Sequence, residues 1–231
     1  MRKIFLILSL FVFVAITPAQ NVLLHKEVND SIIQKYGPNL RNFHHLFISM
    51  GFVMGEPDSS GSDILYGNST NYLVGYRYKL KLSNWFAIGY DIDISSYYFR
   101  LKQSLTKCTP DSILHDKEKF IIGNVGGDLY LRFNYGRRGN RVGNFIDLGG
   151  YGDLKTAAKH FTKDKMLNGN VVEVNTSHLK YVNKYNYGAM ARVGFNRYVI
   201  YGCYRLSDIF KDSQYPELPR ITVGLQIGLH K

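Results

Sequence analysis

The last stretch of the chain, Arg220 to Lys231, reads R-I-T-V-G-L-Q-I-G-L-H-K and has the clearest pattern in the sequence. Apolar side chains occupy every second position from Ile221 to Leu229, and polar side chains or glycines occupy the positions between them. Successive side chains of a β-strand point to opposite faces, so the stretch predicts a strand with one apolar and one polar face. A strand of about 9–11 residues with two such faces can cross a membrane as part of a barrel.

Other segments of the chain show the same alternation. In one of them, Tyr72, Val74 and Tyr76 share a face, while Gly75 and Arg77 share the opposite one. The predicted strands cover residues 44–55, 70–82, 86–102, 120–135, 144–159, 178–195, 198–206 and 220–231.

The connections between these predicted strands alternate between long and short along the chain. Outer-membrane barrels combine short periplasmic turns with longer extracellular loops, and an even number of strands brings both chain ends to the periplasm. The sequence therefore predicts an all-β fold, an eight-stranded antiparallel transmembrane β-barrel with an up-and-down meander.

The polar faces of the predicted strands carry charges of both signs together with glycines. The interior of an eight-stranded barrel is just wide enough to be filled by side chains. We therefore expect the charges to pair in the lumen as a structural network, with glycines leaving room for long arginines, and we expect no wide diffusion pore. The predicted network consists of Arg77, Asp91, Asp93, Asp128, Arg132, Asp147, Arg192 and Arg205.

A soluble barrel of the lipocalin type is the alternative to a membrane barrel. It also has about eight strands, but its apolar face points inward around a ligand. Two features favour the membrane barrel. Tyrosines lie at many strand ends, where an aromatic girdle would meet lipid headgroups. Glycines share the face that carries the charges, and this placement of glycines would have no obvious reason if that face pointed to solvent, as in a soluble barrel.

The N-terminus predicts export. Arg2 and Lys3 precede an apolar run from Ile4 to Ile16, and small residues before a cleavage point follow at Thr17-Pro18-Ala19. This is the pattern of a secretory signal peptide, and the run is short for a membrane-spanning helix. We expect a cleaved signal peptide over residues 1–19, a periplasmic segment over 20–42 and an outer-membrane barrel over 43–231.

The net charge of +11, or +9 after loss of Arg2 and Lys3, indicates the class of partner. An exported basic protein is not expected to bind nucleic acid. The expected anionic partners are outer-membrane lipid and lipopolysaccharide. Other envelope proteins are further possible partners. The chain has two cysteines, Cys108 in a polar loop and Cys203 in a strand, and the sequence leaves open whether they pair.

No arrangement of residues in the sequence indicates catalysis, a metal or a cofactor. His44 and His45 are adjacent in a strand and point to opposite faces. Asp91 and Asp93 share a face and could pair for acid–base chemistry, but the arginines on matching faces favour structural ion pairs. A lipid deacylase would need a serine such as Ser95 beside a histidine, and no strand histidine is suitably placed.

Together, the signal peptide, the eight alternating strands and the ending P-R-I-T-V-G-L-Q-I-G-L resemble the small outer-membrane β-barrel proteins of Bacteroidota. These are similar to the transmembrane domains of OmpA and OmpX and include the PorT-like accessory proteins of type IX secretion. The resemblance covers about Asn42 to the end. One departure is the ending His230-Lys231, because many such barrels end in an aromatic residue.

The resemblance implies a non-enzymatic barrel that serves as an accessory or structural component of an envelope complex, such as secretion or outer-membrane assembly. A free-standing, OmpX-like surface-binding protein is the alternative, and a barrel enzyme acting on lipid is a third reading. The predicted loops are modest and polar, which favours the accessory role over adhesion.

Overall fold

The computed structural model describes residues 36–55, 61–137, 139–166, 168–212 and 215–230. The expected signal peptide and most of the expected periplasmic segment lie outside these ranges. Among the described residues, no helix is long and apolar enough to span a membrane. The strands are β1 (Asn42–Met54), β2 (Thr70–Lys81), β3 (Phe86–Arg100), β4 (Lys117–Tyr135), β5 (Asn144–Lys165), β6 (Val171–Ser177), β7 (Tyr185–Phe195), β8 (Tyr198–Arg205) and β9 (Ile221–Leu229).

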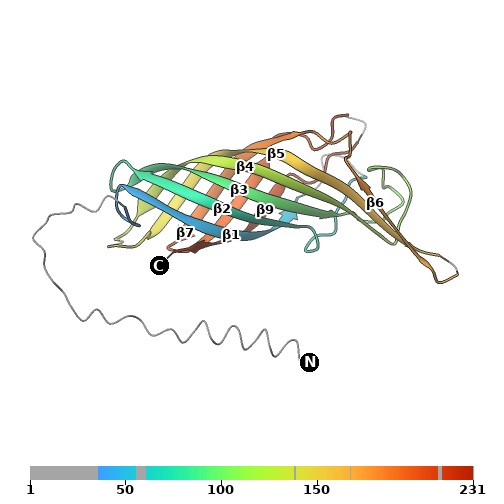
Figure 1. The fold of residues 1–231 in the computed structure, drawn as a ribbon, viewed down its shortest axis with the longest axis horizontal. Coiled ribbons are helices and arrows are strands. Elements are labelled where there is room, and N and C mark those ends of the chain that lie inside the picture. Colours follow the sequence, from blue (N-terminus) through green and yellow to red (C-terminus); the bar gives the residue numbers. More distant parts are fainter. Residues whose placement is uncertain (1–35, 56–60, 138, 167, 213–214, 231) are drawn as a thin grey trace, which may run out of the picture. The chain divides into compact units, whose positions relative to one another are not determined.

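Eight of these strands close into a ring. Antiparallel neighbours follow the order β1-β2-β3-β4-β5-β7-β8-β9, and β9 pairs again with β1. Figure 1 shows these strands slanting side by side around a common interior. The remaining strand, β6, pairs only with the second half of β5. The predicted all-β antiparallel meander with eight strands in the barrel is therefore confirmed, with β6 as an addition.

The connections differ between the two ends of the barrel. At one end, residues 82–85, 136–143 and 196–197 join β2 to β3, β4 to β5 and β7 to β8. In the last of these turns Asn196 adopts a φ of 58°, a left-handed conformation that asparagine tolerates. The other four connections of the eight-stranded ring, which join β1 to β2, β3 to β4, β5 to β7 and β8 to β9, are longer and lie at the opposite end. We call the two ends the short-turn end and the long-loop end, and the predicted alternation of connections is confirmed.

The alternation of side chains decides which face of each strand lies inside. In β7, every second residue is buried and the residues between them are exposed. In β9, Thr222 and Gln226 are buried, whereas Leu225 is 61% exposed. The polar faces thus line the lumen, as predicted. A soluble barrel with an apolar interior is excluded by this arrangement.

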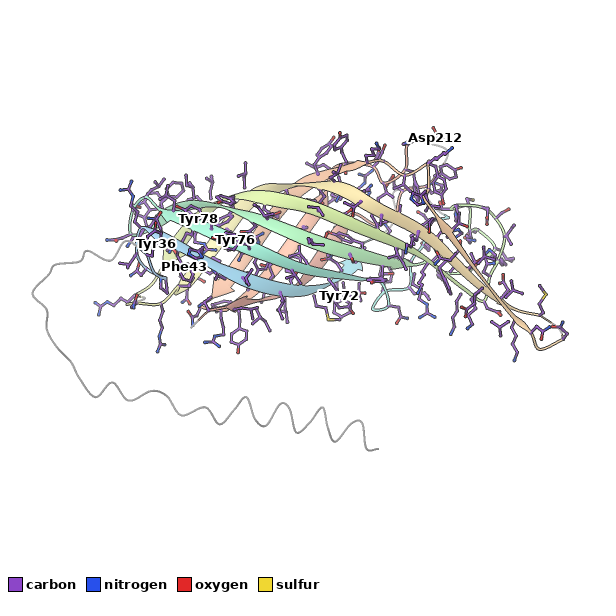
Figure 2. The ribbon with its side chains drawn as sticks, in the orientation of Figure 1. Tyr36, Phe43, Tyr72, Tyr76, Tyr78 and Asp212 are labelled. Atoms are coloured by element: carbon purple, nitrogen blue, oxygen red, sulfur yellow. The ribbon has the colours of Figure 1, made fainter. Side chains whose placement is uncertain are left out.

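The outer wall exposes large apolar side chains on every strand of the ring. Leu129 in the middle of β4 is 73% exposed, and Ile94 on β3 is 65% exposed. Figure 2 shows Tyr76 and Tyr78 near the short-turn end and Tyr72 farther along the wall. An apolar patch of this extent marks a surface that another apolar phase covers. Representative members are Leu46, Val74, Ile92, Ile94, Leu129, Leu148, Tyr187, Ile200 and Leu225.

The chain departs from the prediction between β5 and β7. The predicted strand over 144–159 continues to Lys165, and residues 171–177, predicted as part of a polar loop, return as β6. The β-branched residues Val171, Val172 and Val174 suit this second strand. Figure 1 shows the resulting hairpin extending beyond the long-loop end.

A second correction concerns residues 178–184, which were predicted as the start of a strand. They are irregular, and β7 begins only at Tyr185. Leu179 and Val182 are both buried, three residues apart, so they leave the period of two that a strand requires. Packing of these two side chains at the long-loop end outweighs the local strand propensity.

Candidate functional site

The charged side chains predicted for the lumen lie inside the barrel. Arg77 on β2 donates to both carboxylate oxygens of Asp91 on β3, at distances of 2.7–3.1 Å, and also to Gln226 on β9 at 3.0 Å. Cross-strand pairing explains the first contact, because Arg77 and Asp91 are direct partners in the register. This interaction ties three strands together across the lumen.

A second pair lies closer to the short-turn end, since Arg132 is opposite Ala87 rather than Asp91 on β3. The guanidinium of Arg132 binds the carboxylate of Asp147 through two hydrogen bonds of 2.7 and 2.8 Å. Arg192 joins the two pairs, because it contacts Asp91 at 2.9 Å, Asp128, and its register partner Asp147 at 4.0 Å. Six of the eight predicted residues therefore form one connected network.

The other two predicted residues stand apart from this network. Arg205 pairs with Glu217 in the β8–β9 connection at 2.8 Å and donates to the carbonyl of Leu218 at 2.6 Å. Asp93 is buried, its register partner is Gly126, and it forms no ion pair with a described residue. The structure therefore does not bring Arg205 and Asp93 together with the other six residues.

Aromatic rings, which the prediction overlooked, fill the space between the charges. The guanidinium of Arg132 lies 3.5 Å from the ring centroid of Phe145, and that of Arg77 lies 4.4 Å from the centroid of Phe47. Tyr130 lies within 5.2–5.8 Å of all three network arginines. Such contacts stabilise arginine where water is excluded. The lumen is therefore packed by aromatic rings as well as ion pairs.

The lumen glycines make room for these rings rather than for arginines, which corrects the sequence-based expectation. A Cβ atom at Gly89 would collide with the Tyr130 hydroxyl, and one at Gly194 would collide with the ring of Phe145. Gly75 lies in the same way against Phe47. Alternating apolar and polar positions show which side chains point inward, but they do not show which inward side chain fills the space at a glycine.

The long-loop end carries an apolar core, which we call the cap. It combines the ends of β1, β3 and β4 with residues of the long loops. A cavity between the cap and the lumen has a volume of only about 20 Å³, room for a single water molecule. The cap residues are Val53, Ile64, Phe99, Leu101, Phe120, Ile122, Leu179, Val182, Ile209, Phe210 and Leu218.

A buried carboxylate anchors the β3–β4 loop to the cap. Glu118 accepts hydrogen bonds from Lys107 at 2.6 Å and from Gln103 at 2.8 Å, and its other oxygen lies 2.7 Å from His160 Nε2. Burial alone would raise the pKa of the Glu118 carboxyl, but the hydrogen bonds from these three side chains hold it below its usual value. The loop is therefore fixed by a charged network, not only by apolar packing.

The β5–β6 hairpin is the most exposed element of the long-loop end. Every residue of β6 is exposed. Lys163 on β5 pairs with Glu173 on β6 at 2.6 Å, and His115 in the β3–β4 loop lies 2.7 Å from the Asp164 carboxylate. These contacts hold the hairpin against its neighbouring loop and leave both of its faces open to a partner.

The residues weighed for catalysis are not brought together. Ser95 lies inside the barrel and accepts a hydrogen bond from Asn124 at 3.3 Å, with no histidine bonded to it among the described residues. The ring of His45 lies against the rings of Phe43 and His230 at the short-turn end, with centroid distances of 5.0 and 4.8 Å. Over the described ranges, no group of histidine, cysteine and carboxylate side chains could hold a metal ion.

The two cysteines are free and lie in different surroundings. Cys108 is exposed in the β3–β4 connection, whereas Cys203 is partly buried on β8. The sequence left their pairing open, and the structure has no disulfide between them.

Comparison with known proteins gives few matches. No protein-family model and no curated protein matches the sequence. Among solved structures, the chain is similar to Ail, the attachment invasion locus protein of Yersinia pestis, determined in complex with the heparin analogue sucrose octasulfate. The two chains are 12% identical, the alignment covers 80% of this chain and 94% of Ail, and the TM-score is 0.30. A similarity at this level supports no assignment of function. The assignment of a barrel is based on the strand pairing of this chain.

Proposed function

We propose that the chain is an outer-membrane β-barrel with a filled lumen, which presents its long-loop end outside the cell as a binding surface. The observation that carries this proposal is the combination of a closed ring, an apolar outer wall and a charged interior. Water would disfavour this arrangement, because each square ångström of exposed apolar surface costs roughly 25 cal/mol. Lipid would favour it, since a closed barrel leaves no backbone edge unpaired.

The filled interior supports a role in binding rather than in diffusion. Arg77, Arg132 and Arg192 are buried in the lumen and pair with carboxylates on several strands. Phe47, Phe145 and the cap occupy the remaining space. A barrel of this size that is filled with side chains has no room for a wide channel.

The long-loop end supports contact with a partner. The β5–β6 hairpin extends past the other strands, and its exposed residues include Val172 and Val174 beside Lys163 and Glu173. An exposed strand edge of this kind can pair with an extended segment of another protein. The hairpin is therefore the element we assign to partner recognition.

The accessory role in an envelope complex, including a type IX secretion complex, rests on the sequence resemblance alone. A free-standing surface protein and an accessory subunit differ in the part of the molecule that contacts a partner, and this difference can be tested. A surface-binding protein should use the hairpin, whereas an accessory subunit should associate with other envelope proteins through the barrel or the short-turn end.

The test is cross-linking on intact cells with a membrane-impermeant reagent, followed by purification in mild detergent. It compares the full chain with a variant whose residues 163–174 are replaced by a two-residue Asn-Gly turn. Partners that are lost with the hairpin support surface binding. A stoichiometric envelope complex that forms equally with both chains contradicts it and supports the accessory role.

A further inference from the structure

A groove lined by lysines runs along the outer wall at the long-loop end. Residues 155–159 of β5 form one side, residues 177–184 form the other, and Lys211 from the β8–β9 connection lines its edge. The groove has a volume of about 640 Å³, within the usual range of ligand-binding clefts. Its lining includes His178 and five lysines but no carboxylate, and the lysines are Lys155, Lys159, Lys180, Lys184 and Lys211.

The positive charge of this groove is not compensated by the protein. None of the five lysines forms an ion pair with a described carboxylate, although Lys163 and Lys107 at the same end do. Lys155 differs from the other four lysines, because its register partner is the buried Asn124 and it also lines the small interior cavity beside Arg205. The charge that the groove offers to a ligand therefore comes from the exposed lysines Lys159, Lys180, Lys184 and Lys211.

Two carboxylates of the neighbouring β8–β9 connection are engaged by arginines. Asp208 pairs with Arg220 at 2.6 Å, and Glu217 pairs with Arg205 at 2.8 Å. Neither of them forms an ion pair with an exposed lysine of the groove. A groove with several unpaired lysines is suited to bind a polyanionic ligand.

The groove is rigidly built. Leu179 and Val182 of its second side are buried in the cap, so the lysines between and beyond them are turned outward. The backbone N–H of Lys155 donates to the carbonyl of Lys184 at 2.7 Å, and that of Lys211 donates to Tyr181 at 2.9 Å. These bonds fix the two sides and the edge relative to one another without a ligand.

The position of the groove along the barrel wall identifies the kind of anion. The apolar wall ends directly beneath it at Leu154 and Tyr185, which are register partners and are 46% and 70% exposed. The first exposed lysines beyond them toward the long-loop end are Lys184, directly before β7, and Lys159 on β5. In a membrane, tyrosines at such a boundary lie at the level of the lipid headgroups.

We propose that this groove binds the phosphate groups of a phosphorylated glycolipid in the outer leaflet. The inference rests on the proposed function, because it requires the long-loop end to face the outer leaflet. Lysine ammonium groups bind phosphate as point charges, and the adjacent Leu154 and Tyr185 accommodate acyl chains. A soluble polyanion would have no use for these apolar neighbours.

The test measures lipid binding by the full chain folded into phosphatidylcholine vesicles. Fluorescent bis-phosphorylated lipid A is the probe, and lipid A without phosphates and soluble dextran sulfate are the comparison ligands. The groove variant is Lys159→Gln with Lys184→Gln. The matched control is Lys102→Gln with Lys165→Gln, which removes the same charge from exposed lysines at the same end.

We expect the groove variant to bind lipid A about twentyfold more weakly than the parent, because each lysine near an anionic lipid surface contributes about a fivefold factor. The control variant should stay within about twofold of the parent, and dephosphorylated lipid A should not distinguish the variants. Equal lipid A binding by the groove and control variants overturns the inference. The inference is also overturned if the groove variant loses affinity for dextran sulfate but keeps its affinity for lipid A.

The state of the barrel in the vesicles separates this inference from the proposed function. Folded, inserted chain migrates differently from boiled chain on a gel. A chain that inserts but shows no groove effect overturns the lipid site alone. A chain that does not insert overturns the proposed function and the lipid site together.

Discussion

The guanidinium of Arg132 and the carboxylate of Asp147 form two hydrogen bonds, of 2.7 and 2.8 Å, and neither side chain is more than 1% exposed. Removing either partner leaves the other charge buried and unpaired, which is far more costly than the pair itself is favourable. This relationship gives the most sensitive test of the packed lumen and of its predicted structural role.

Replacing Arg132 by Leu should lower the free energy of unfolding by about 3–5 kcal/mol, because the carboxylate of Asp147 loses its partner. Joint replacement of Arg132 and Asp147 by Leu should recover part of this loss. Urea titration of the refolded barrel in lipid vesicles measures both effects. Arg137→Leu, at an exposed turn position, is the control and should unfold like the parent. An Arg132→Leu barrel as stable as this control would show that the lumen is not a coupled network.

Replacing Leu225 by Arg should destabilise the barrel by about 2–4 kcal/mol if the side chain lies near the midplane of the lipid. Leu225 is 61% exposed on the outer wall of β9. Leu105 is 96% exposed in the β3–β4 connection, so Leu105→Arg changes the same residue types where water is expected and should have little effect. Urea titration in vesicles again provides the measurement. Equal stability of the two variants would contradict the assignment of the outer wall to lipid.

Cys108 should react with a membrane-impermeant maleimide on intact cells, because it is exposed at the long-loop end. The Cys108→Ser variant should not be labelled, since Cys203 lies within a strand of the ring and is shielded. Labelling is read by mass shift on a denaturing gel, and purified, reduced protein serves as the reference for full reactivity. Reaction that appears only after the outer membrane has been opened would invert the topology.

Acid should loosen the β3–β4 loop through Glu118. A carboxyl whose pKa is lower in the folded state stabilises the fold at pH above its unfolded pKa and loses this contribution as the pH falls through the folded pKa. We therefore expect the hydrogen-exchange protection of residues 101–116, measured relative to the intrinsic exchange rate at each pH, to fall below pH 4.5, the reference pKa of glutamate. Glu118→Gln should show reduced protection at neutral pH and no acid step, while exposed Glu173→Gln keeps the step. Protection in the parent that does not change with pH would contradict the anchoring role.

The sequence predicts the ring well because most barrel strands obey one local rule. The exception is β1, where Leu46, Phe47 and Ile48 make both faces apolar and only the structure shows that Phe47 points inward. In β9, the alternation from Ile221 to Leu229 is unbroken, and the burial in the structure follows it residue by residue. The turn at Asn196-Arg197 and the long connections are equally local, since they appear as interruptions of the same period. The inward position of Arg77 and Arg132 followed from the same period.

Features that depend on distant residues could not be predicted in this way. The contact of Gly194 with the ring of Phe145 joins different strands, and no spacing along one strand shows it. Arg205 has the correct face but meets Glu217 from a loop instead of the central network. The cap depends on how Leu179 and Phe210 pack together, and their segments carry no regular pattern.

The central claim is that the apolar wall of the closed ring faces the lipid of the outer membrane. Fractionation of cells that express the full chain, combined with gel mobility before and after boiling, tests this claim most directly. We predict that the mature chain is found with the outer membrane and migrates as a folded species until it is boiled. Recovery of the chain as a soluble periplasmic protein, with the same mobility before and after boiling, would contradict it.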